Sequence, residues 1–200
     1  MRWTVALLAS ISLLPMPGFA LSDIAVDDLA HHPIALDFPS GGQLNLRIRS
    51  GEIRIVGSDE NKIVVRAEGK QGSDSTDISA RFEGTDRFGK LYVHGGPSNE
   101  VTITVQVPRN SDLSVRIVAG NVEVRDITGN KDVKLGAGDL TVDVGNAADY
   151  SHVEASVTSG SIEASPFGES RGGLFRSFEK FGKGKYKLEA HVGAGDLTLK

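Results

Sequence analysis

The sequence predicts an all-β fold: a β-solenoid-like stack of strand–glycine corner–strand repeats, with an antiparallel meander in its N-terminal part. Three observations lead to this prediction. Apolar and polar side chains alternate with a period of two through most of the chain, which is typical of half-buried strands. A motif centred on a glycine recurs five times. Glycine accounts for 24 of the 200 residues, against a usual share of ~7%.

The first twenty residues are typical of a secretory signal peptide. Arg2 precedes an apolar stretch over residues 4–14, and Gly18-Phe19-Ala20 places small residues before a cleavage site at Ala20. We therefore expect residues 1–20 to be removed on export, leaving a periplasmic or extracellular chain. No later stretch is long and apolar enough to predict a transmembrane segment in the mature chain.

The rest of the chain divides into a polar N-terminal segment, 21–39, and one predicted domain, 40–200, with an insertion at 165–187. The length suits a single domain with its own core. The chain has no cysteine, which excludes disulfides and thiol chemistry. Its net charge of −4 argues against a general nucleic-acid binder, so no nucleic-acid partner is expected.

The five copies of the repeat appear when the chain is aligned on each glycine that follows a small residue. The copies are LNLRIRSGEIRI (44–55), LSVRIVAGNVEV (113–124), KDVKLGAGDLTV (131–142), VEASVTSGSIEA (153–164) and LEAHVGAGDLTL (188–199). The apolar phase slips by one residue at the glycine, so both flanking strands stay buried only if the backbone bends there. Glycine can adopt the positive φ of such a corner. The predicted corner glycines are Gly51, Gly120, Gly138, Gly160 and Gly195.

The spacing between successive copies predicts how they pack. Self-similarity near 20 residues indicates units that bury their apolar faces on their neighbours. The first residue of each copy is apolar except in the third copy, where Lys131 occupies this position. If the copies stack in chain order, Ser161 lies between Asp139 and Asp196 and separates the two carboxylates. We expect these aspartates to serve as turn residues, because the paired aspartates of calcium-binding repeats are missing.

The middle of the chain is expected to add a meander of hairpins between the first copy and the later ones. Alternating segments lie at 63–67, 78–82, 91–93 and 101–107, with polar turns at 69–76 and 94–100. Together with the repeats, they predict at least ten strands and no helix longer than about three turns.

One part of this pattern resembles a known family. The segment VTITVQVPRNSDLSV (101–115) is a strand that ends in Val-Pro and turns into a new strand, and the corners with a small residue, glycine and an aliphatic residue follow it. This arrangement resembles the putative-adhesin β-strand-repeat family of the bacterial envelope, over roughly residues 40–200. The resemblance implies an exported all-β repeat domain with an adhesin-like role.

The sequence offers little for catalysis or for cofactors. The GAGD motif lacks the third glycine of a dinucleotide fingerprint and the lysine of a phosphate loop, and a strand follows it instead of a helix. The five histidines show no metal-ligand spacing, and GESRGG is not a nucleophile elbow. We therefore expect no enzyme activity, no cofactor and no metal.

The insertion at 165–187 is aromatic and basic, unlike the sequence around it. Leu174, Phe178 and Phe181 have the i, i+4, i+7 spacing of a short helix, which glycines at both ends would terminate. One interpretation is a cap whose phenylalanines cover an open sheet edge; the other is a contact for an anionic envelope surface. The candidate contact residues are Arg171, Phe175, Arg176, Phe178, Lys180, Phe181 and Lys183.

The function predicted from these observations is a non-catalytic exported binding or structural module of the bacterial cell envelope, adhesin-like in character. Its partner would be an envelope protein, a polysaccharide or an anionic lipid surface. Two alternatives stay open. One is a periplasmic scaffold or sensor partner in envelope-stress signalling, and the other is a carbohydrate-active enzyme on a β-solenoid.

Overall fold

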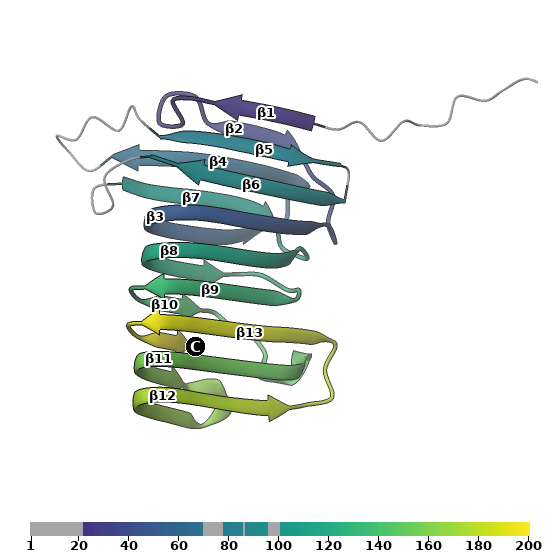
Figure 1. Cartoon of the computed structure of the whole chain (residues 1–200). Helices are drawn as coiled ribbons and strands as arrows, with labels where there is room; N and C mark the ends of the chain where they lie inside the picture. The colour runs from purple at the N-terminus through teal and green to yellow at the C-terminus, as the bar shows by residue number, and fades with distance from the viewer. Residues whose placement is uncertain (1–21, 70–77, 86, 96–100) are drawn as a thin grey trace, which may run out of the picture.

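The computed structural model describes residues 22–69, 78–85, 87–95 and 101–200 (Figure 1). The predicted signal peptide and most of the two predicted turns at 69–76 and 94–100 lie outside these residues. Within them the chain forms 14 strands and two single-turn 3-10 helices, Ala147–Asp149 and Ser165–Phe167. The prediction of an all-β fold is confirmed. No helix in the described ranges is long and apolar enough to span a membrane.

The strands follow one another closely along the chain. In chain order they are β1 (Ser22–Val26), β2 (Ile34–Asp37), β3 (Gln43–Ser58), β4 (Lys62–Gly69), β5 (Ser79–Gly84), β6 (Phe88–His94), β7 (Val101–Pro108), β8 (Asp112–Arg125), β9 (Lys131–Ala137), β10 (Leu140–Val142), β11 (Tyr150–Ala164), β12 (Glu169–Phe181), β13 (Tyr186–Ala194) and β14 (Leu197–Leu199).

The strands build two faces that meet along the corners. The first face has the order β1-β5-β6-β3-β8-β9-β13-β11-β12, and the second has the order β2-β4-β7-β3-β8-β10-β14-β11-β12. β3, β8, β11 and β12 bend and so belong to both faces. The path β8-β10-β14-β11-β13-β9 returns to β8, which closes a ring of six parallel strands with further strands at both ends.

The expected N-terminal meander takes a different form. Its antiparallel pairs β5–β6 and β4–β7 lie on opposite faces, and β6 and β7 join β3 by parallel pairing. The N-terminal segment 21–39, which the sequence predicted to lie outside the domain, also contributes a strand to each face. β1 pairs with β5, and β2 pairs with β4. Leu29 and Phe38 of this segment are buried in the core.

The copies of the repeat do not stack in chain order, which corrects one expectation. The last copy, β13–β14, lies between the third copy, β9–β10, and the fourth copy, β11. The hexapeptide GAGDLT, which occurs at 136–141 and again at 193–198, therefore lies beside its own second copy, with Leu140 paired to Leu197. Asp139 and Asp196 are adjacent instead of separated, and the Asp196 N–H donates to Asp139 Oδ1 at 3.2 Å. Asp196 Oδ1 accepts from the Ser161 hydroxyl at 2.7 Å.

The five predicted corner glycines form a column where the two faces meet. Their φ angles are +141° at Gly51, +131° at Gly120, +118° at Gly138, +134° at Gly195 and +138° at Gly160, in their order through the stack. Each glycine lies against the backbone of its neighbour. A Cβ atom on Gly138 would lie 2.0 Å from the Gly120 carbonyl oxygen, and one on Gly195 would lie 2.1 Å from the Gly138 carbonyl oxygen.

The core fills the space between the faces. Alternate residues on each strand point inward, so Leu44 and Leu46 before the first corner, and Ile53 and Ile55 after it, are all fully buried. Because the apolar pattern shifts by one residue at Gly51, the apolar side chains point into the core on both sides of the bend. The outward residues of the first face are consequently held in register from strand to strand.

Candidate functional site

The predicted insertion supplies the strand at one end of the molecule (Figure 1). β12 pairs antiparallel with β11 from His152↔Phe181 to Ala164↔Glu169, and it follows the bend of β11 so that Gly173 lies beside Gly160. Within the described residues, no further strand pairs with the outer edge of β12. The insertion therefore forms the end strand of both faces.

The predicted short helix at 174–181 is wrong, because these residues belong to the strand β12. Helical spacing would put Leu174, Phe178 and Phe181 on one buried face, but Leu174 is 64% exposed and Phe181 is 73% exposed. A helix of two or three turns is marginal by itself. Pairing with β11 offers backbone hydrogen bonds along twelve register pairs, and this tertiary interaction decides the conformation.

The predicted arginines mostly contact β12 itself. Arg171 Nη1 donates to the Ser177 carbonyl oxygen at 2.6 Å, and its guanidinium pairs with Glu169 at 2.9 Å. Arg176 Nε donates to a backbone carbonyl oxygen of the same strand at 2.9 Å. Lys183, in the loop after β12, is exposed. These groups brace the bend in β12 and do not converge on one site.

The predicted aromatic residues divide between core and solvent. Phe178 is 4% exposed and packs near Phe167, with ring centroids 6.1 Å apart. Lys180 Nζ lies 5.6 Å from the centroid of the Phe167 ring and donates to the Phe167 carbonyl oxygen at 3.2 Å. Phe175 is 80% exposed, and Phe181 stacks on a histidine ring at 4.9 Å while remaining largely exposed.

This division predicts different costs for two phenylalanines of β12. Phe178→Ala should lower the free energy of unfolding by about 2–3 kcal/mol, because it empties a buried position at the edge of the core. Phe175→Ala should change it by no more than about 0.5 kcal/mol, because the ring is in solvent. Urea unfolding of both variants tests the difference, and equal midpoints would contradict the placement of these side chains.

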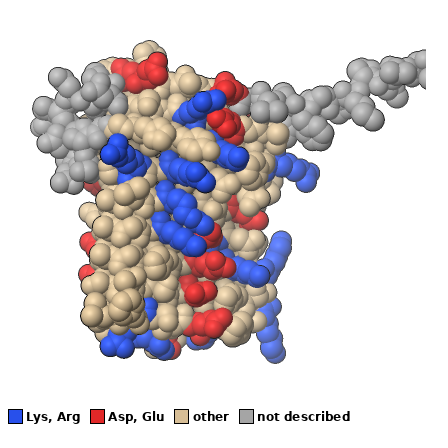
Figure 2. All heavy atoms as spheres, in the orientation of Figure 1, with Lys and Arg blue, Asp and Glu red and all other residues tan. Residues whose placement is uncertain are grey.

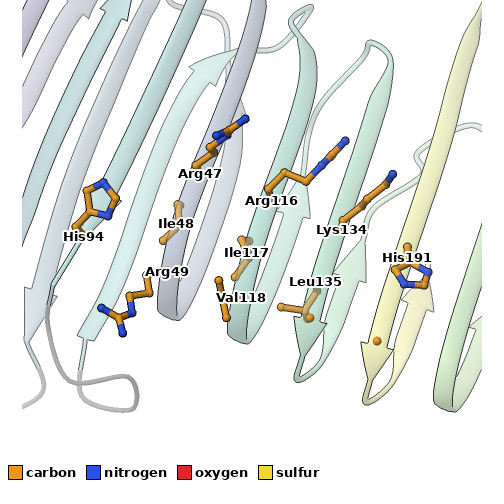
Figure 3. Close-up of a pocket in the computed structure, with 12 residues that line it drawn as sticks. Arg47, Ile48, Arg49, His94, Arg116, Ile117, Val118, Lys134, Leu135 and His191 are labelled. Carbon is orange, nitrogen blue, oxygen red and sulfur yellow. The ribbon is translucent and has the colours of Figure 1, made fainter.

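A row of basic side chains crosses the first face, four residues before the corner glycines. The register pairs Arg47 with Arg116, Arg116 with Lys134, and Lys134 with His191. Figure 3 shows these four side chains on successive strands. Because neighbouring strands are about 4.8 Å apart, the row places one basic side chain at each strand step. We call these four residues the basic row.

An open groove of about 770 Å³ lies along the basic row. Its floor is apolar, and Val118 on its rim is 66% exposed. Gly136 and Gly193, the first glycines of the two GAGDLT segments, present no side chain to it. The groove is lined by Arg47, Ile48, Arg49, His94, Arg116, Ile117, Val118, Lys134, Leu135, Gly136, His191 and Gly193.

The two groove glycines are required by close packing. A Cβ atom on Gly136 would lie 2.5 Å from the Val118 carbonyl oxygen, and one on Gly193 would lie 2.3 Å from the Gly136 carbonyl oxygen. Any side chain at these positions would push the strands apart. The hexapeptide therefore recurs for two structural reasons, since one of its glycines keeps the groove open and the other makes the corner.

The charge of the first face changes along the stack. Six residues before each corner glycine, a second row in register reads Asn45, Ser114, Asp132, Glu189 and Glu154. Arg116 forms an ion pair with Asp132. Figure 2 shows Lys and Arg gathered over the middle of this face, and Asp and Glu below them toward β12.

The period-two alternation of the strands predicts outward positions for Arg47, Arg116 and Lys134, but it does not predict a site. The sequence does carry a signal for this site at the position four residues before each corner glycine. This residue is basic in four of the five copies and is Ser156 in the other. The order of the copies was also needed. The copy that contains Ser156 lies at the end of this series, next to the copy that contains His191. The four basic side chains therefore stand on four successive strands.

Lys131, the exception in the repeat, is buried at 1% exposure. Its ammonium donates to the hydroxyl of Tyr150, which in turn donates to the Val144 carbonyl oxygen at 3.1 Å. The ammonium also lies 5.0 Å from the centroid of the Tyr150 ring. Burial lowers the pKa of Lys131 to about 8 and raises the pKa of Tyr150 to about 12. This pair closes the end of the core opposite the corners.

Comparison with known proteins gives a likeness of structure. No protein-family model and no curated protein sequence matches the chain. A crystal structure of a putative cell adhesion protein from Clostridium sporogenes matches with a TM-score of 0.50 and 14% identity, over 90% of this chain and all of that one. A putative adhesin from Bacteroides fragilis gives a TM-score of 0.23 at 11% identity, over 86% of this chain and 99% of that one. The clostridial match shows that this chain shares the fold of that protein.

Proposed function

We propose that the chain is a non-catalytic, adhesin-like binding module, exported to the bacterial cell envelope, that holds an anionic envelope component along the basic row. The observation that carries this proposal is the groove of about 770 Å³, which runs beside basic side chains on four successive strands. The units then act as a solenoid-like stack, whose outer face is an extended binding surface.

The lining of the groove suits binding better than bond cleavage. Arginine and lysine donate charge-assisted hydrogen bonds to carboxylates and phosphates, and arginine does so through a planar fork. None of the described residues that line the groove is a carboxylate or a hydroxyl nucleophile. A paired acid and base, as in hydrolysis of a glycosidic bond, would need such groups.

Two further observations support the proposal. The fold is shared with a protein described as a putative cell adhesion protein. The leader pattern at 1–20 supports export, and the mass of the exported protein should place its N-terminus at or near Leu21. We assign β12 and its buried Phe178 to a structural role as the end strand, because Arg171 and Arg176 also contact backbone atoms of β12 itself.

Cosedimentation of the purified protein with isolated envelope fragments tests the function. We expect the unaltered protein to sediment with the fragments and the double variant Arg47→Glu/Lys134→Glu to stay in the supernatant, because the groove would then repel an anionic ligand. Both residues are exposed, so the fold should survive, as an unchanged urea midpoint would show.

A second variant separates the groove from the end strand. Phe175→Ser/Lys183→Gln changes exposed residues of the insertion and should sediment like the unaltered protein. Loss of binding in this variant, with binding retained in the groove variant, would move the site to β12. Failure of the unaltered protein to bind any envelope fraction would refute the proposed function.

A further inference from the structure

We infer that the groove takes a linear acidic polysaccharide, with the sugar chain crossing the strands and its carboxylates over Arg47, Arg116 and Lys134. The inference rests on the proposed binding function and adds the chemical class of the ligand and its direction on the face. Its starting point is the register, which aligns these three cations across β3, β8 and β9.

The repeat of the protein matches the repeat of such a polymer. Parallel strands are about 4.8 Å apart, so Arg47, Arg116 and Lys134 present one cation at each such interval along the stack. A pyranose residue in a linear chain is about as long as this interval. A linear polymer with one carboxylate on each sugar can therefore follow the row. Its successive sugars are rotated about the chain axis, so the long side chains of the row reach those carboxylates that face the sheet.

The three cations of the row differ in whether they already have a partner. Arg47 and Lys134 form no ion pair with any residue in the described part of the chain, and both are exposed. Arg116 is held by Asp132 and by the Asp132 carbonyl oxygen at 3.1 Å, which keeps its guanidinium in the row. Figure 3 shows these side chains projecting in the same direction from neighbouring strands.

The groove beside the row suits a sugar ring. Gly136 and Gly193 leave room at two neighbouring strands, and Val118 offers an exposed apolar surface to the C–H face of a pyranose. Groups of this kind, a few charged donors over an apolar floor, are typical of sites that hold a ligand in one orientation.

The second row of the first face argues for a narrow polymer instead of an anionic bilayer. Asp132, Glu189 and Glu154 lie in register two residues from the basic row. A flat anionic surface on this face would meet these carboxylates together with the cations, and like charges repel. A single sugar chain can follow the basic row and avoid Glu189 and Glu154, and the charge of Asp132 is offset by its ion pair with Arg116.

Titration calorimetry with oligogalacturonates of defined length tests the inference. We expect binding to strengthen with length up to about four sugars, which matches the four strands of the basic row, and then to level off. Neutral malto-oligosaccharides of the same lengths should not bind. Equal binding of the neutral and acidic chains would contradict the charge-based assignment.

Two matched double variants test whether the ligand binds in the groove. Arg47→Gln/Lys134→Gln should weaken binding of the four-sugar acid by about tenfold and reduce its salt dependence. Lys62→Gln/Arg66→Gln removes the same charge from exposed positions on β4, in the second face, and should bind like the unaltered protein. Equal weakening in both variants would show that only net charge matters and would overturn the site.

The remaining outcomes separate this inference from the proposed function. If the unaltered protein sediments with envelope fragments but binds no oligogalacturonate, the function stands and the polysaccharide assignment fails. Tighter binding to anionic phosphatidylglycerol vesicles or to single-stranded DNA than to the uronate would likewise overturn it. If neither fragments nor oligogalacturonates bind, the function and the inference both fail.

Discussion

Gly138→Ala is expected to lower the free energy of unfolding by about 2–6 kcal/mol. The residue has a φ of +118°, which costs any L side chain about 1–3 kcal/mol. Its Cβ atom would also lie 2.0 Å from the Gly120 carbonyl oxygen, and overpacking of this kind adds about 1–3 kcal/mol or more. Because that contact is backbone against backbone, no rotation of a side chain can relieve it. Urea unfolding monitored by circular dichroism measures the loss.

Gly145→Ala is the matched control for this prediction. Gly145 also has a positive φ, +66°, but a Cβ atom there would meet nothing within 4 Å. The variant should therefore lose only the cost of the left-handed conformation, about 1 kcal/mol. Equal unfolding midpoints for the two variants would show that the column of corner glycines does not require its close contacts.

Tyr150→Phe is expected to destabilise the protein by about 1.5–3 kcal/mol at neutral pH, whereas Lys131→Met should be neutral or stabilising. Removal of the Tyr150 hydroxyl leaves the buried Lys131 ammonium without its hydrogen-bond acceptor. Replacement of Lys131 by methionine removes the charge and keeps the volume. Thermal unfolding of both single variants checks the opposite signs, and similar losses in both would contradict the assigned role of the pair.

The same pair predicts how stability depends on pH. The pKa of Lys131 is about 8 in the folded state, below the ordinary lysine value of 10.5, so the unfolded chain binds more protons than the folded chain between these two pH values. The free energy of unfolding should consequently rise by about 2 kcal/mol from pH 7.5 to 9.5. Above about pH 10 the raised pKa of Tyr150 reverses the slope, because the unfolded chain loses that proton first.

Lys131→Met is the control for the pH dependence. The variant has no amine at this position, so its free energy of unfolding should not show the rise between pH 7.5 and 9.5. A rise of the same size in the variant would assign the effect to other groups.

The corners connect stability to the proposed function. A glycine column that holds neighbouring backbones in contact also fixes the register of the residues before it, because each corner starts from the same position in its strand. Arg47, Arg116 and Lys134 therefore line up without direct contact among themselves. Like charges at adjacent positions of a sheet repel one another. The packing of the corners offsets this repulsion, and an anionic ligand would reduce it.

The conformations of the repeats could be predicted from local sequence alone. Alternation before and after Gly51 identifies two strands with buried faces, and the phase slip identifies the bend, because both depend only on neighbours along the chain. Residues 174–181 show the limit of this reasoning. Their spacing is helical, but the open edge of β11 pairs with them, and no local pattern records that edge.

The candidate site could not be predicted from local sequence, because it depends on which distant segments pair with one another. The sequence alone determined an all-β chain, the five corner glycines and the outward positions of Arg47, Arg116 and Lys134, since side-chain periodicity and backbone sterics act over a few residues. Only the tertiary structure decided that the last copy inserts before the fourth, which joins His191 to Lys134 and makes two aspartates neighbours. The physical reason is that strand pairing satisfies the same backbone groups in any order, so the contacts between copies select one order from several.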